Sequence, residues 1–244
     1  MGETKKPDHH QEGGKCMRSR RATQRLIVTE QAKSPIVEAY RALRTKILYS
    51  KTYGELKSIM FTSTGSGEGK STTIANMAII LAQSGKKVIL MDCDLRKSVQ
   101  HLIFGNENRG LTNFLLEDVT TDELLQDTEV ENLRILTSGP IAPDPSQLLG
   151  SEKMEQLFDY LKTQADYLII DVPPVIAVTD ACILASKVDG IFLVVNSGTI
   201  RREMAQKAKE LLIDANGHVL GAILNRVELE QEDDYYYYGS ERGK

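Results

Sequence analysis

A glycine-rich loop between a buried strand and a helix constrains this chain more than any other feature. The loop runs Thr64-Gly65-Ser66-Gly67-Glu68-Gly69-Lys70-Ser71. Residues 58–62 before it form a short apolar run, and residues 72–83 after it carry apolar side chains at helical spacing. This order of strand, loop and helix predicts a phosphate-binding loop (P-loop), because free backbone N–H groups and a helix N-terminus attract anions.

The loop supplies groups that suit a nucleotide and its magnesium ion. We expect Lys70 to reach the β- and γ-phosphate oxygens and Ser71 to ligate Mg²⁺. The residues predicted to bind the nucleotide are Gly65, Ser66, Gly67, Glu68, Gly69, Lys70, Ser71 and Thr72. A strict P-loop pattern has glycine where this chain has Thr64, so a glycine-rich turn without a ligand is the alternative. The expected cofactors are ATP and Mg²⁺.

Two further apolar runs end in acidic residues. Residues 88–91 precede Asp92 and Asp94, and residues 167–170 precede Asp171. Both runs are continuous rather than alternating, which indicates strands buried on both faces. An ionised Asp at such a strand end is costly unless it meets a cation or a donor, so Asp92 and Asp171 are expected to organise Mg²⁺. The alternative for Asp92 and Asp94 is N-capping of a helix, and Arg96 is expected to assist phosphate or to form a structural ion pair.

The remaining sequence alternates strands and helices, as a doubly wound, mostly parallel α/β sheet requires. The expected strands are 58–62, 88–91, 133–136, 167–171, 190–195 and 219–224, and the expected helices lie near 35–50, 70–83, 151–163, 179–187 and 201–214. Residues 97–132 are less regular and are expected to form short helices. The 244 residues fit a flexible basic arm at 1–33, one P-loop domain at 34–227 and an acidic, tyrosine-rich tail at 228–244.

The net charge and the cysteines indicate which binding partners and which cellular compartment suit this chain. The net charge of −4 gives no overall attraction to nucleic acid. Residues 1–25 hold seven Lys and Arg against three Asp and Glu, so this arm is expected to be disordered and solvated, with contact to a membrane or an acidic partner as the alternative. Cys16, Cys93 and Cys182 form no C-x-x-C pair, which favours a reducing, cytoplasmic location. No apolar run approaches the roughly 18 residues of a membrane span.

The helix expected at 35–50 separates apolar from charged residues. Its apolar side is formed by Ile36, Tyr40, Leu43 and Ile47, which fall within about 60° of one another at 100° per residue. Glu38, Arg41 and Arg44 spread over the other side and flank, where they are free to face another subunit. The alternative is an i, i+3 pair between Glu38 and Arg41 on a solvated helix.

The tail contains four consecutive tyrosines, Tyr235, Tyr236, Tyr237 and Tyr238, after an acidic stretch. No pattern around them could bury them, so we expect phosphoacceptors, with a partner-binding tail as the alternative. The nine residue-to-residue steps from Val227 to Tyr236 extend up to about 30 Å, enough to reach a neighbour's phosphate site. Each phosphate adds about 1.5–2 negative charges, which would repel similar tails and favour dissociation of an assembly.

Together these motifs resemble the bacterial tyrosine kinases of capsule and exopolysaccharide synthesis. The resemblance runs from about Ser34 to Tyr238 and includes the P-loop, the Asp-x-Asp-Leu-Arg and Asp-x-Pro-Pro strand ends, an E-x-x-R-x-x-R helix and the tyrosine-rich tail. It implies a P-loop NTPase fold of the MinD/ParA kind and transfer of the ATP γ-phosphoryl group to tyrosine. Departures from the family pattern are Ser66 in the loop, and Ala142 and Asp144 in a proline-rich turn.

The resemblance also implies roles for particular residues. Lys70, Asp92 and Asp94 are the expected catalytic residues, and Asp94 would take the proton of the acceptor phenol, whose pKa near 10 leaves it protonated at pH 7. Asn225 is the expected adenine contact. Glu38, Arg41 and Arg44 are implied in a homo-oligomer, which closes into a ring if the rotation permits.

The implied partners are the cytosolic segment of a transmembrane polysaccharide co-polymerase adaptor, which recruits the kinase to the inner face of the membrane, and protein substrates of sugar-nucleotide metabolism.

Two alternative functions stay open. A MinD/ParA-like regulatory ATPase would usually carry lysine where this P-loop has Gly65. A noncatalytic, nucleotide-dependent scaffold would not need the complete set of Lys70, Ser71 and the three aspartates.

Overall fold

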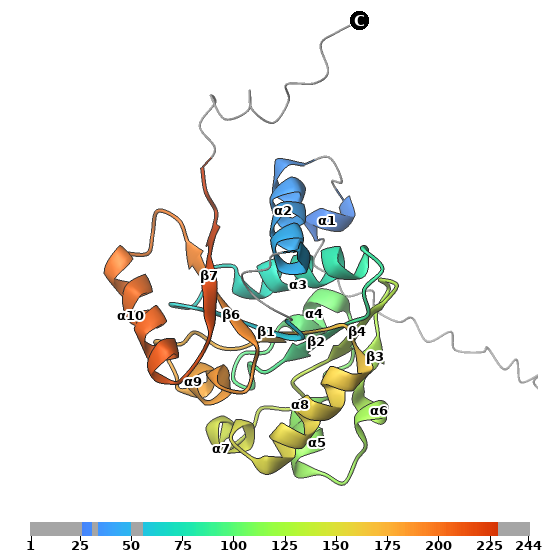
Figure 1. The fold of residues 1–244 in the computed structure, drawn as a ribbon. Helices are drawn as coiled ribbons and strands as arrows, with labels where there is room; N and C mark the ends of the chain where they lie inside the picture. The colour runs from blue at the N-terminus through green and yellow to red at the C-terminus, as the bar shows by residue number, and fades with distance from the viewer. Residues whose placement is uncertain (1–25, 31–33, 50–55, 229–244) are drawn as a thin grey trace, which may run out of the picture.

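The computed structural model describes residues 26–30, 34–49 and 56–228, and within them a single mixed sheet organises the chain (Figure 1). Its strands are β1 (Ser58–Ser63), β2 (Val88–Asp92), β3 (Gln126–Asp127), β4 (Leu133–Leu136), β5 (Tyr167–Asp171), β6 (Gly190–Asn196) and β7 (Val219–Asn225). They lie in the order β3-β4-β2-β5-β1-β6-β7. Every neighbouring pair is parallel except β3 with β4. The predicted doubly wound, mostly parallel fold is confirmed.

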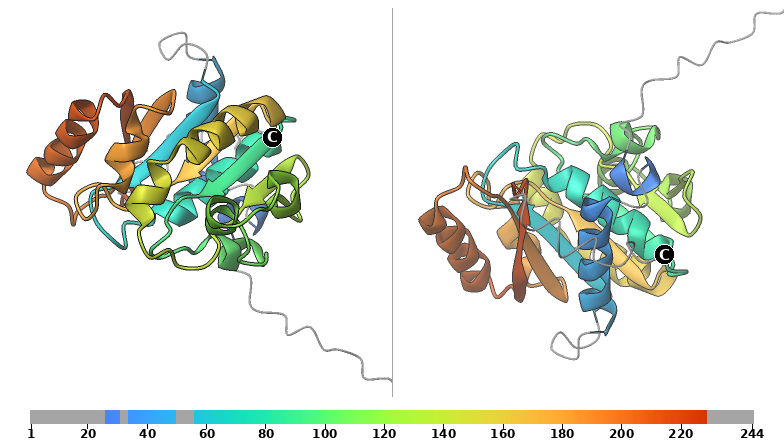
Figure 2. Two further views of the ribbon diagram at one scale, coloured as in Figure 1. Left: turned by 90° about the horizontal axis from the view of Figure 1, so that it is seen from below. Right: turned by 90° about the horizontal axis from the view of Figure 1, so that it is seen from above.

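Helices cover both faces of this sheet (Figures 1 and 2). They are α1 (Ile27–Glu30), α2 (Pro35–Tyr49), α3 (Lys70–Ala82), α4 (Gln100–Phe104), α5 (Leu111–Leu116), α6 (Thr121–Leu124), α7 (Pro145–Leu149), α8 (Glu152–Gln164), α9 (Asp180–Ala185) and α10 (Arg202–Asp214). In Figure 1, α2 and α3 lie above the sheet, and α5, α7 and α8 lie below it. In the described part of the chain, no helix is both long and apolar enough to cross a bilayer.

Alternate residues of the strands pack into two separate hydrophobic cores, one on each face of the sheet. In β1, Ile59 and Phe61 pack with α2 and α3, whereas Met60 packs with the helices of the opposite face. All six residues of β1 are buried, as are all five of β2. A strand buried on both faces reads as a continuous apolar run, which is why the central strands were predictable from the sequence.

Several local features differ from the sequence expectation. Residues 97–132 form the short helices α4, α5 and α6 as predicted, but they also contain β3, which was not predicted. The short helix α7 was not predicted either. On α2, Val37 is buried while Ile36 is 50% exposed, so the predicted apolar side was placed too far toward Ile36.

The segment 26–30, within the predicted arm, packs onto the domain. Leu26 and Val28 are buried, and the Val28 N–H donates to Asn76 Oδ1 of α3 at 3.3 Å. These contacts show that part of the chain before residue 34 belongs to the core. The remaining arm, with Cys16, and the tail from residue 229 lie outside the described residues, so their assignment stays a prediction.

The carboxyl ends of β1, β2 and β5 meet at one edge of the sheet. β5 lies between the other two, and the strand register pairs Asp92 with Asp171 and Phe61 with Asp171. In open α/β sheets, ligands bind outside the carboxyl ends of the strands. The fold thus brings the P-loop after β1 and both acidic strand ends to the same edge.

Candidate active site

Two glycines let the P-loop turn into α3. Gly67 and Gly69 have φ values of 80° and 82°, the left-handed region that residues with a Cβ rarely adopt. At Gly69 a Cβ would also overlap the side-chain amide nitrogen of Asn225. The helix starts immediately afterwards at Lys70, and its first turn contains no acidic residue that would compete with a phosphate.

Glu68 organises the loop from within. Its Oε1 accepts hydrogen bonds from the Thr64 hydroxyl and the Gly65 N–H, and its Oε2 accepts one from the Asn196 N–H at 3.0 Å. The residue is only 2% exposed. The carboxylate is therefore engaged by the protein, and the threonine that breaks the strict P-loop pattern is one of its donors. Binding of the nucleotide by Glu68 stays a prediction.

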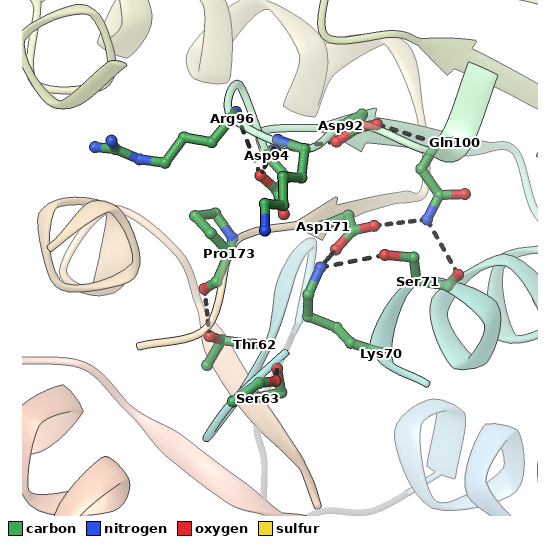
Figure 3. A network of polar contacts seen from close by, with 12 residues as sticks. Thr62, Ser63, Lys70, Ser71, Asp92, Asp94, Arg96, Gln100, Asp171 and Pro173 are labelled. Carbon is green, nitrogen blue, oxygen red and sulfur yellow. Dashed lines mark hydrogen bonds and ion pairs between the residues drawn. The ribbon is translucent and has the colours of Figure 1, made fainter. Parts of the chain in front are cut away.

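Lys70 lies at the centre of the site (Figure 3). Its Nζ forms an ion pair with Asp171 Oδ1 and donates to Ser71 Oγ at 3.3 Å. Lys70 and Asp171 are both buried, so this charge pair is shielded from water. The structure thus brings together Lys70, Ser71 and Asp171, as predicted, although they are up to 101 residues apart in the chain.

Asp92 sits beside Asp171 at the neighbouring strand end. It is completely buried, and its Oδ1 and Oδ2 accept the N–H groups of Asp94 at 3.1 Å and Gln100 at 3.2 Å. Burial, and secondly the charge of Asp171, raise the pKa of Asp92 to about 8, although Lys70 opposes this shift. Gln100 is the first residue of α4, so Asp92 accepts an N–H from the start of this helix, but the N-cap residue itself is Val99, whose side chain makes no capping hydrogen bond. Two adjacent buried carboxyl groups nevertheless favour a cation between or beside them.

A cleft of about 230 Å³ separates the P-loop from Asp94. It is lined by Ser63, Gly65, Ser66, Gly67, Glu68, Gly69, Lys70, Ser71, Thr72, Asp94, Lys97, Val99 and Pro174. All predicted P-loop residues are among them, and Asp94 is the predicted acid that faces the same space. Its Oδ1 accepts the N–H groups of Arg96 at 3.3 Å and Lys97 at 2.9 Å, which fixes the orientation of the carboxylate.

Arg96 forms a structural ion pair, one of the two roles expected for it. Its Nε and Nη2 each donate to a different oxygen of the fully buried Asp180 at 2.9 Å, and Nη2 also donates to Ser146 Oγ at 3.1 Å. In Figure 3 the guanidinium points away from Lys70. Sequence reasoning missed Asp180, Ser146 and the cleft residue Lys97. Lys97 could have been found from its position directly after Arg96, whereas nothing local marks the other two.

Asn225 joins the end of β7 to the P-loop. Its Nδ2 donates to the backbone oxygen of Glu68 at 2.8 Å, and its Oδ1 accepts the Arg226 N–H at 3.0 Å. A second groove of about 460 Å³, lined largely by apolar side chains, begins here and runs between α2 and β7. The predicted adenine contact of Asn225 stays a prediction.

The charged residues of α2 show one pairing within the chain. Glu38 and Arg41 form an ion pair, and their side chains are 49% and 41% exposed. Arg44 has a buried Nε with no hydrogen-bond partner among the described residues. Their predicted role in an oligomer interface is untested by this arrangement, and the predicted phosphoacceptors Tyr235–Tyr238 lie outside the described residues.

Comparison with known proteins identifies the family. A family model described as an AAA domain matches residues 56–212. The chain is 43% identical over 224 residues to tyrosine-protein kinase YwqD of Bacillus subtilis, covering 91% of this chain and 94% of that protein. The chain belongs to the bacterial tyrosine-protein kinases. It is accordingly an enzyme that transfers a phosphoryl group from ATP to protein tyrosine.

Solved structures agree with this assignment. The kinase resembles the crystal structure of the chimerical protein CapA2B2 with a TM-score of 0.80 and 41% identity, over 84% of this chain and 90% of that one. It also resembles the septum site-determining protein MinD of Pyrococcus horikoshii, solved as a complex with Mg-ADP, with a TM-score of 0.60 and 25% identity, over 74% and 76% of the two chains. The predicted P-loop NTPase fold of the MinD/ParA kind is confirmed.

Proposed function

We propose that this kinase autophosphorylates its C-terminal cluster Tyr235–Tyr238 in trans within an oligomer and so regulates the synthesis and export of capsular or extracellular polysaccharide. The main supporting observation is that Lys70, Ser71 and Asp94 line one cleft, while Asp171 forms an ion pair with Lys70. This arrangement brings a phosphate-binding loop and a candidate proton acceptor to the same space.

The donor set fits Mg²⁺. Ser71 offers a hydroxyl, and Asp92 and Asp171 offer carboxylate oxygens, the hard ligands that Mg²⁺ prefers. Within the described residues no group of three or more His, Cys, Asp or Glu could enclose a metal ion, and Mg²⁺ commonly keeps waters and substrate phosphates instead. When bound there, Mg²⁺ neutralises charge on the β- and γ-phosphates. The MinD complex with Mg-ADP supports the same use of this fold.

In the proposed phosphoryl transfer, Lys70 would contact the γ-phosphate and Asp94 would accept the phenolic proton. The Lys70 ammonium, paired with Asp171 in this structure, would exchange that partner for γ-phosphate oxygens, because its flexible side chain lines the cleft beside the P-loop. As the tyrosine oxygen bonds to the γ-phosphorus, the bond from phosphorus to the β–γ bridging oxygen breaks and ADP leaves. The phenolic proton goes to Asp94, whose carboxylate is held in place by two N–H groups.

The family resemblance supports the remaining parts of the proposal. The cytosolic segment of a transmembrane co-polymerase adaptor would recruit the kinase to the inner face of the membrane, and proteins of sugar-nucleotide metabolism would be its other substrates. Asn225, at the start of the groove between α2 and β7, would contact the adenine.

Phosphotyrosine mass spectrometry of the full chain with Mg-ATP tests this function, with and without the adaptor's cytosolic segment. We expect phosphate on Tyr235–Tyr238 in the wild type and none in Lys70→Met, which loses the ammonium at the phosphates. Lys209→Met, on the exposed side of α10, is the matched control and should label normally. Wild-type labelling of Lys70→Met would overturn the P-loop assignment. Absence of labelling in all conditions, with ATP turnover intact, would favour the regulatory ATPase.

A further inference from the structure

Gln100 connects three parts of the active site, although it belongs to none of the motifs. Its Nε2 donates to Asp171 Oδ2 at 2.7 Å and to the backbone oxygen of Ser71 at 3.1 Å. Its backbone N–H donates to Asp92 Oδ2 at 3.2 Å. One residue at the start of α4 therefore holds the ends of β2 and β5 and the first turn of α3 (Figure 3).

The orientation of the Gln100 amide follows from its neighbours. Asp171 and the Ser71 carbonyl both present acceptors, so rotation of the amide by 180° would place its oxygen against two other oxygens. In Figure 3 the nitrogen faces Asp171 and the amide oxygen points away from it. The nitrogen therefore serves both acceptors.

This orientation leaves the oxygen of the amide without a hydrogen-bond donor in the described part of the chain. Gln100 is completely buried, and its Oε1 has no hydrogen-bond partner among the described residues. A buried acceptor without a partner is unfavourable, and an apolar side chain of the same length would avoid this cost. The amide is thus a poor choice for packing alone, and its value lies in the two hydrogen bonds that it donates.

Those bonds matter most when Lys70 engages a phosphate. Asp171 has one oxygen paired with Lys70 and the other with Gln100. If Lys70 turns to the γ-phosphate, Asp171 loses one partner and keeps Gln100, so its carboxylate keeps its orientation. Hydrogen bonds of this kind, made to groups that themselves contact a metal ion, typically change metal affinity by about 10–100-fold.

We propose that Gln100 is a positioning residue whose side-chain amide orients Asp171 for the magnesium ion of the bound nucleotide. The proposal rests on the proposed function, because it takes Ser71, Asp92 and Asp171 as the site of that ion. Gln100 itself need not touch substrate or metal.

Binding of Mn²⁺, a spectroscopic substitute for Mg²⁺, tests the proposal in the full chain. Electron paramagnetic resonance would measure free Mn²⁺ in the presence of ADP for the wild type and Gln100→Met, which keeps the length of the side chain and removes the amide. We expect Mn²⁺ binding about 10–100-fold weaker in the variant. The affinity for ADP without metal should change less than about twofold, and the melting temperature should not fall. Gln156→Met, at an exposed site on α8, is the matched control and should bind Mn²⁺ as the wild type does.

Two more variants distinguish failure of the Gln100 proposal from failure of the proposed metal site. Gln100→Leu also removes the amide with an apolar side chain of different shape, so it should weaken Mn²⁺ binding similarly, and it replaces Gln100→Met if that variant does not fold. Ser71→Ala should weaken binding by removing a proposed ligand. If Ser71→Ala has no effect, the metal site of the proposed function is wrong and the Gln100 proposal fails with it. If Ser71→Ala weakens binding while both folded Gln100 variants match the wild type, only the Gln100 proposal is overturned.

Discussion

Among single residues, Arg96 illustrates how a motif side chain can act at a distance from the cleft. Asp180 and Ser146 hold its guanidinium, and the Ser146 hydroxyl also donates to Asp180 at 2.9 Å. These bonds fasten the loop that carries Asp94 to α7 and α9. The Asp180 carboxylate is fully buried, so its removal leaves an incompletely paired cation rather than a simple surface change.

We therefore predict that Asp180→Asn lowers kcat for tyrosine phosphorylation by about tenfold and leaves KM for ATP nearly unchanged. In the proposed mechanism, a displaced Asp94 would impair proton removal in the transition state, whereas the P-loop would still bind the nucleotide. Steady-state kinetics would measure both constants, with Asp159→Asn on the exposed side of α8 as the control. An unchanged kcat would show that the ion pair does not position the loop.

Asp189 supports a prediction on pH. Its carboxylate accepts hydrogen bonds from the Lys57 N–H at 2.9 Å, the Ser58 N–H at 2.7 Å and the Ser58 hydroxyl at 2.9 Å. Burial alone would raise the pKa of Asp189, but these hydrogen bonds outweigh it and hold the pKa below its ordinary value. A lowered pKa stabilises the fold above the unfolded-state pKa of about 3.9, and this stabilisation is lost as the pH falls through the lower, folded-state pKa.

Asp189→Asn should accordingly lower the free energy of unfolding by about 1–2 kcal/mol at pH 7, a modest value because the side chain is 34% exposed. The difference from the wild type should shrink below about pH 4. Urea unfolding at several pH values would measure it. A difference that stays constant from pH 7 to pH 3 would contradict the role of the ionised carboxylate.

At the scale of elements, the burial of its side chains shows which face of α2 packs against the core. Val37 is 1% exposed and Ile36 is 50% exposed. We predict that Val37→Ala lowers the free energy of unfolding by about 2 kcal/mol, because it removes buried methyl groups and leaves a cavity. Ile36→Ala should change it by less than about 0.5 kcal/mol. Equal effects in chemical denaturation would mean that α2 is not packed in this orientation.

The same helix marks the limit of prediction from sequence. Helical spacing predicted the element and an apolar side, but neighbouring positions differ by only 100°, and packing against α3 decides which of them faces inward. The central strands were predictable because burial on both faces makes their sequences continuously apolar. β3 has two residues and no periodicity, so it was missed. Gln100 and Asp180 were missed because their partners are 71 and 84 residues away in the chain.

For the whole molecule, the charged residues of α2 bear on the proposed contact between copies of the chain. Glu38 and Arg41 pair with each other in one chain, while the buried Nε of Arg44 has no hydrogen-bond partner among the described residues. An exposed pair of this kind contributes little to the stability of one chain, so its charges can be exchanged for those of a neighbour at small cost. This exchange would give a heterologous contact, which propagates around a ring or along a filament.

We predict that Arg41→Ala combined with Arg44→Ala shifts the kinase to smaller species in solution, because both cationic partners of a neighbour's Glu38 are lost. Multi-angle light scattering would measure the mass, and circular dichroism would check that the fold is retained. Arg201→Ala combined with Arg202→Ala, at the exposed start of α10, is the matched control. An unchanged mass for the α2 variant would leave Glu38 and Arg41 as an ordinary pair on a solvated helix.

The hydrogen bond from Asn225 to Glu68 fixes where the tail begins, because β7 ends at the rim of the P-loop. Ten residues later comes Tyr235, and an extended segment of that length spans about 30 Å. A tyrosine tethered in this way has an effective concentration on the order of a millimolar near its own cleft. Under the proposed function, phosphorylation between subunits would therefore compete with an intramolecular reaction, and it would prevail only where an assembly offers neighbouring clefts at a comparable local concentration.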